Sequence, residues 1–93
     1  MEFTLENQKD NIFNLARRIG YHFLRKNGEE FEFARPPAGY PRFHLFLKDE
    51  SGLVFNIHLD QKKPVYKGTH AHAGEYDGEI LQKEIERIKN ELR

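Results

Sequence analysis

Apolar residues recur at helical spacing near both ends of the chain. In residues 4–20, "TLENQKDNIFNLARRIG", the spacing predicts a helix that Thr4 caps and Gly20 ends in the left-handed conformation. In residues 77–92 the expected N-cap is Asp77, and four residues form one apolar stripe: Leu81, Ile85, Ile88 and Leu92. The chain is therefore expected to begin and end with an amphipathic helix.

Residues 21–34, "YHFLRKNGEEFEFA", read as a β-hairpin. The Asn27-Gly28 pair favours a two-residue type I′ turn, which would place Leu24 opposite Phe31. The face expected to be buried then carries His22, Leu24, Phe31 and Phe33. The other face carries Tyr21, Phe23, Arg25, Glu30 and Glu32.

A second hairpin is expected over residues 42–60, "RFHLFLKDESGLVFNIHLD". A two-residue turn would mix polar and apolar side chains on both faces, whereas a three-residue loop, Glu50-Ser51-Gly52 with a left-handed glycine, separates them. One face then collects Phe43, Leu45, Leu47, Leu53, Phe55, Ile57 and Leu59. The opposite face is polar, and it places His44 directly across from His58.

These elements predict an α+β two-layer sandwich formed by a single domain, residues 1–93. Two hairpins would make a four-stranded antiparallel sheet, and the N- and C-terminal helices would pack on its apolar face in the order αββββα. The segment "RPPAGYP" between the hairpins reads as a stiff connector, because proline neither donates to a sheet nor continues a helix. The second face of the sheet is expected to be open.

Composition narrows the chemistry. The 93 residues include no cysteine, so thiol catalysis and cysteine-ligated zinc are excluded, and any metal must be bound by His, Asp or Glu. Fifteen basic and fifteen acidic residues give no net charge that would steer the chain to nucleic acid or a membrane. With an acidic start and no long apolar run, we expect a cytoplasmic protein that is monomeric or weakly dimeric.

Four of the five histidines fall between residues 44 and 72: His44, His58, His70 and His72. Residues opposed in a sheet have Cβ atoms about 5 Å apart, so His44 and His58 can share one cation. The stretch "THAHAGE" can add His70 or His72, and Asp60 or Glu75 can add an oxygen. We expect a divalent transition metal such as zinc here; the alternative is that these are ordinary surface histidines.

Two further function classes remain open from the sequence. The polar face, with Phe46, Asn56, Lys62 and Lys63, can hold a phosphate-bearing ligand or, with Phe23 and Tyr21, stack the bases of single-stranded RNA or DNA. Alternatively, His58 with an acidic partner can act as the general base of a phosphodiester hydrolase. The sequence thus predicts a small binding domain whose functional surface is this face and the loop 68–78.

Overall fold

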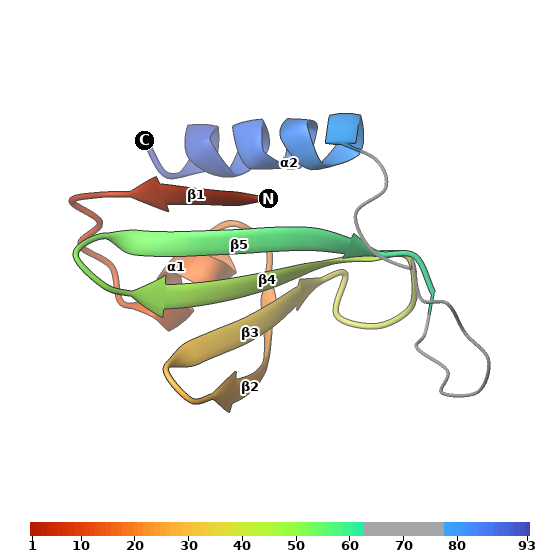
Figure 1. The fold of residues 1–93 in the computed structure, drawn as a ribbon, viewed down its shortest axis with the longest axis horizontal. Coiled ribbons are helices and arrows are strands. Elements are labelled where there is room, and N and C mark those ends of the chain that lie inside the picture. Colours follow the sequence, from red (N-terminus) through yellow and green to blue (C-terminus); the bar gives the residue numbers. More distant parts are fainter. Residues whose placement is uncertain (63–77) are drawn as a thin grey trace.

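The computed structural model describes residues 1–62 and 78–93, which form one antiparallel sheet and two helices. The strands are β1 (Glu2–Leu5), β2 (His22–Asn27), β3 (Glu30–Arg35), β4 (Arg42–Asp49) and β5 (Leu53–Asp60), and the helices are α1 (Ile12–Arg18) and α2 (Gly78–Glu91). The strand order across the sheet is β1-β5-β4-β3-β2, with β1 and β2 at the two edges (Figure 1). The α+β class is confirmed, but the sheet has five strands and the order is βαββββα.

The β4–β5 hairpin has the predicted register. His44 pairs with His58, and Asp49 with Leu53, so residues 50–52 form the three-residue loop. Gly52, however, does not have a positive φ, and this part of the prediction is wrong. Glycine is needed there for close approach instead, because a Cβ at Gly52 would lie 2.9 Å from Cγ2 of Thr4 on β1.

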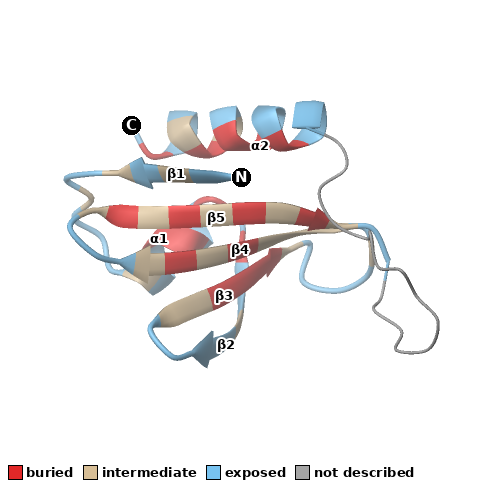
Figure 2. Cartoon of the chain, in the orientation of Figure 1, coloured by how far each residue is buried: buried red, intermediate tan, exposed pale blue. Residues whose placement is uncertain are grey.

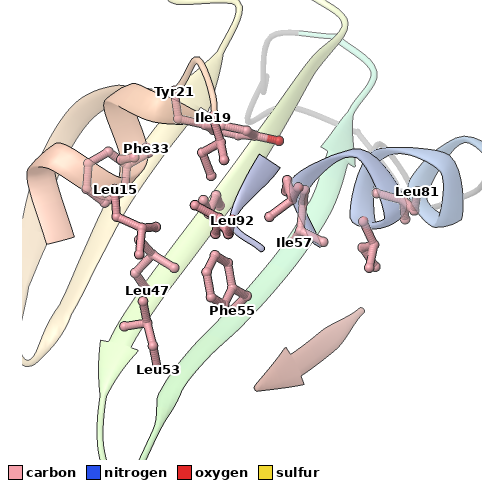
Figure 3. Close-up of a cluster of buried hydrophobic side chains, with 14 of the residues drawn as sticks. Leu15, Ile19, Tyr21, Phe33, Leu47, Leu53, Phe55, Ile57, Leu81 and Leu92 are labelled. Carbon is pink, nitrogen blue, oxygen red and sulfur yellow. The ribbon is translucent and has the colours of Figure 1, made fainter. Parts of the chain in front are cut away.

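Burial alternates along β5 and over residues 44–48 of β4, as the register requires. Every second residue of β5 is buried and its neighbours are half-buried (Figure 2). One core cluster joins this apolar face to residues from both helical regions, among them Leu15, Ile19, Leu81 and Leu92 (Figure 3). Both helices therefore pack on the predicted apolar face, and the four residues of the predicted apolar stripe, three in α2 and Leu92 just after it, are all buried.

The first strand was missed by the sequence prediction. Residues 2–5 pair with β5, and the ring of Phe3 stacks on that of Phe55 at a centroid distance of 4.6 Å. Helix α1 is correspondingly shorter, because its N-cap is Asn11, whose side chain accepts a 2.8 Å hydrogen bond from the amide of Asn14. Thr4 is therefore a strand residue rather than a cap.

The end of α1 agrees with the prediction. Gly20 has a φ of +86°. The amide of Tyr21 donates to the carbonyl of Ala16 at 2.9 Å, and that of Gly20 to the carbonyl of Arg17 at 3.1 Å, which together form a Schellman motif. This motif turns the chain directly into β2.

The β2–β3 hairpin differs from the predicted register. Asn27 pairs with Glu30, so the loop is Gly28-Glu29, and Gly28 rather than Asn27 has a positive φ, of 65°. This is the arrangement of type II′ turns, in which glycine occupies the first loop position. The register also shifts between Phe23 and Arg25, which marks a β-bulge at this edge strand.

The bulge moves three side chains from their predicted faces. Phe23 pairs with the buried Phe33 and packs on Phe13 of α1, with ring centroids 5.2 Å apart, so it lies on the helix face. Tyr21, expected on the open face, is a core residue, and His22, expected inside, is exposed. The physical cause is the aromatic cluster under α1, in which Phe23 packs against the rings of Phe13 and Phe33.

Candidate metal site on the open face of the sheet

Four ionisable side chains from three adjacent strands meet on the open face. They are Glu32 from β3, His44 from β4, and His58 and Asp60 from β5. The His44 and His58 rings face each other across the β4–β5 pair with centroids 5.2 Å apart and an interplanar angle of 66°. The predicted juxtaposition of these two histidines is therefore confirmed.

His44 lies between two carboxylates. Its Nε2 is 3.1 Å from Oε1 of Glu32, and its Nδ1 is 3.3 Å from Oδ2 of Asp60. Phe46 stacks on the same ring at a centroid distance of 4.4 Å. With these three contacts the His44 side chain is only 13% exposed, so its ring orientation is fixed.

His44, His58 and Asp60 are placed so that three ligand atoms come together. One atom from each, two imidazole nitrogens and a carboxylate oxygen, lies within 4.8 Å of the other two. All three residues are half-buried. The predicted ligands His70 and His72, and the alternative oxygen ligand Glu75, lie outside the described residues.

Two arginines balance the two carboxylates of the cluster. Arg25 forms an ion pair with Glu32, and Nε of Arg42 lies 3.5 Å from Oδ2 of Asp60. Glu32 is buried, with 4% of its surface exposed, whereas the Arg25 side chain is 58% exposed. Glu32 is therefore held by His44 from the protein side and by Arg25 from the solvent side.

Glu32 was not assigned to the site from the sequence. It was placed on the solvent-facing side of a hairpin, where a carboxylate needs no explanation. It becomes buried because β3 is an inner strand and Glu32 pairs with Phe46 of β4. The β3–β4 register would have predicted this burial, but the proline-containing connector between the two strands leaves that register undetermined in the sequence.

The residues predicted to hold a phosphate-bearing ligand are spread over a wider area. Phe46 and Asn56 are cross-strand neighbours on the open face. Lys62 is exposed beyond the end of β5, and Lys63 lies outside the described residues. Tyr21 and Phe23 are not on this face, so the platform of three aromatic residues expected for stacking nucleic-acid bases is not formed.

Comparison with known proteins gives no match to a family model, and no significant match to a curated protein or to a solved structure. No helix within residues 1–62 and 78–93 is long and apolar enough to cross a lipid bilayer. The chemistry of the open face is therefore the basis for any functional assignment.

Proposed function

We propose that this domain binds a divalent transition metal, with zinc as the best-suited ion, through His44, His58 and Asp60. The observation that carries the proposal is the approach of their three ligand atoms to within 4.8 Å of one another. Two imidazole nitrogens and one carboxylate oxygen are a common zinc donor set, and nickel and copper also accept imidazole. The ligand atoms that lie farthest apart would have to draw together by up to about 1.5 Å, because donors around tetrahedral zinc lie about 3.3 Å apart.

Glu32 supports the metal proposal through His44. Metal-bound histidines almost always donate their second ring N–H to a carboxylate or carbonyl, which fixes the tautomer. Glu32 stands 3.1 Å from Nε2 of His44, and this leaves Nδ1 for the metal. Nδ1 is also the nitrogen on the Asp60 side, at 3.3 Å from Oδ2, which is close to the donor spacing of a tetrahedral site.

A metal-free interpretation uses the same contacts. Both nitrogens of His44 can donate hydrogen bonds only in the protonated imidazolium, and that cation would satisfy Glu32 and Asp60 without any metal. The two interpretations differ in what happens to the proton. Zinc can bind only an unprotonated Nδ1, whereas the ion-paired imidazolium keeps a proton on that nitrogen.

Isothermal titration of the chelator-treated protein with zinc chloride at pH 7.5 tests the proposal, in two buffers of different ionisation enthalpy. We expect one equivalent of zinc to bind with release of protons, and His58→Ala and Asp60→Asn each to weaken binding at least about tenfold. His22→Ala is the matched control, since this exposed histidine lies on β2, two strands away from β4. Zinc heats that are equal in all four proteins, or absent from all, would contradict the proposal.

Cobalt(II) gives an independent readout of the same site. Tetrahedral cobalt absorbs visible light far more strongly than octahedral cobalt in water, so an intense band should develop on titration. The band should be lost in His58→Ala and retained in His22→Ala. A weak, octahedral spectrum in the wild-type protein would argue against a site with His44, His58 and Asp60 as joint ligands.

A further inference from the structure

A pocket at one end of the sheet is separate from the proposed ligand atoms. It lies where β3 ends, β4 begins, β5 ends and α2 begins, and its volume is about 390 Å³. Its apolar lining comes from Phe43, Leu59 and Ile80, with two prolines of the connector. Its charged lining is Arg35 and Arg42, and no acidic residue of the described chain lines it.

Arg42 has unsatisfied hydrogen-bonding capacity. Its side chain is only 16% exposed, and its Nε is fully buried without a hydrogen-bond partner among the described residues. The guanidinium packs over the Tyr40 ring at 4.8 Å from its centroid, and its ion pair with Asp60 is long, at 3.5 Å. A guanidinium offers five donors, and buried donors are nearly always paired, so a missing acceptor is indicated.

Arg35 brings a surplus positive charge to the same pocket. Its Nη1 donates to both carboxylate oxygens of Glu84 at 3.2 and 3.3 Å. Glu84 also accepts from Arg87, at 3.0 Å from Nε and 2.9 Å from Nη2, so two guanidiniums share one carboxylate. One positive charge of this trio is therefore uncompensated, and the Arg35 side chain is still 38% exposed.

We propose that this pocket binds a small organic oxyanion, a carboxylate or phosphate monoester carried on a ring or a short apolar chain. Arg42 and Arg35 would bind the charged group, because guanidinium donors match the geometry of these oxyanions. Phe43, Leu59 and Ile80 would cover the apolar body. The volume is that of a small-molecule site, and the combination of apolar lining with few polar groups is typical of such sites.

The proposal does not depend on the metal, and it is tested with metal-free protein. Phenyl phosphate, benzoate, inorganic phosphate and benzyl alcohol are titrated separately while backbone amide shifts are followed by NMR. We expect phenyl phosphate or benzoate to shift amides around Arg35, Arg42 and Ile80, and the tighter of the two identifies the preferred anion. Inorganic phosphate and benzyl alcohol, which each lack one half of the ligand, should bind at least about tenfold more weakly.

Variants separate the two halves of the pocket. Arg42→Gln should weaken the preferred anion about tenfold or more, the value of one charge-assisted hydrogen bond. Ile80→Ser should also weaken it and leave the affinity for inorganic phosphate unchanged; Ile80 is 42% exposed, so this variant should fold even if Arg42→Gln does not. Arg17→Gln, an exposed arginine on α1, is the control and should bind like the wild type. Absence of binding by both organic anions, or equal binding by the wild type and Ile80→Ser, would overturn the proposal.

Discussion

The hydroxyl of Tyr21 donates a 2.7 Å hydrogen bond to Oε2 of Glu84, inside the protein and between residues 63 positions apart. The same carboxylate accepts from Arg35 at the end of β3 and from Arg87 on α2. Arg87 in turn donates to the carbonyl of Ile19 at 2.6 Å, just after α1. One buried carboxylate therefore joins both helices to the sheet.

Tyr21→Phe should lower the free energy of unfolding by about 1.5 to 3 kcal/mol at pH 8, because it removes a buried hydrogen bond to a charged group. Burial, and then the charge of Glu84, raise the pKa of Tyr21 far above its usual value. Above pH 10 the unfolded chain loses the Tyr21 proton while the native state keeps it, so wild-type stability should fall with pH, by up to about 1.4 kcal/mol per pH unit.

The measurement is urea unfolding of both proteins between pH 8 and pH 11. The other tyrosines and the lysines titrate in both, so the contribution of Tyr21 is the difference between the two curves. That difference should be constant up to about pH 10 and then shrink. A difference that stays the same up to pH 11 would show that the Tyr21 proton is not linked to folding.

Phe55→Ala should lower the free energy of unfolding by about 3 to 5 kcal/mol, as expected for a cavity at a fully buried aromatic residue. The Phe55 side chain also stacks on Phe3, so part of the lost free energy of unfolding would come from weaker packing of β1 against β5. His58→Ala, on the opposite face of the same strand, is the comparison and should cost less than about 1 kcal/mol. Urea unfolding followed by circular dichroism gives both values, and similar losses would contradict the assignment of faces.

The register of the β4–β5 hairpin could be predicted from the sequence because it depends only on residues that are close together in the chain. Alternating apolar residues from Phe43 to Leu59 are compatible with one register only, and that register places His44 opposite His58. Asp60 follows two residues after His58 and so shares its face. The loop at residues 50–52 sets this register, so it alone brings the possible metal ligands His44, His58 and Asp60 to the same face.

The features that were missed depend on contacts between distant segments. β1 has four residues, too few for a clear pattern, and it is a strand because β5, about fifty residues later, pairs with it. The bulge before Arg25 reflects packing of Phe23 on α1. Burial of Glu32 and Glu84 likewise depends on which strands and helices meet, and neither position differs in sequence from a solvent-exposed glutamate.

Zinc affinity should depend steeply on pH if His44 and His58 are both ligands. Only the neutral imidazole binds a metal, so zinc affinity should fall as the pH is lowered, by about tenfold per pH unit for each histidine ligand that is protonated in the metal-free protein. Isothermal titration at half-unit steps between pH 5 and pH 8 gives the slope. A slope of zero over the whole range would mean that zinc displaces no protons even at pH 5, which would contradict histidine ligands.

Glu32→Gln should weaken zinc binding by about ten- to a hundredfold, although Glu32 is not proposed as a ligand. The neutral amide can still contact Nε2 of His44, but it no longer favours the tautomer that leaves Nδ1 for the metal. Glu30→Gln is the matched control, two residues earlier on the same strand and face. The thermal midpoint of each metal-free variant measures any purely structural effect, and equal zinc affinity in both variants would contradict the role assigned to Glu32.

Zinc and an organic oxyanion should bind cooperatively, because Asp60 is a proposed zinc ligand and also the ion-pair partner of Arg42. Zinc would withdraw the Asp60 carboxylate from the guanidinium and leave Arg42 more positive toward the pocket. Benzoate should therefore bind about fivefold or more tightly to the zinc-loaded protein, and benzoate should tighten zinc binding by the same factor. In Arg42→Gln this enhancement should disappear, whereas benzoate bound directly to zinc would keep it. Equal benzoate affinities of the metal-free and zinc-loaded wild-type proteins would show that the two sites are not coupled through Asp60 and Arg42.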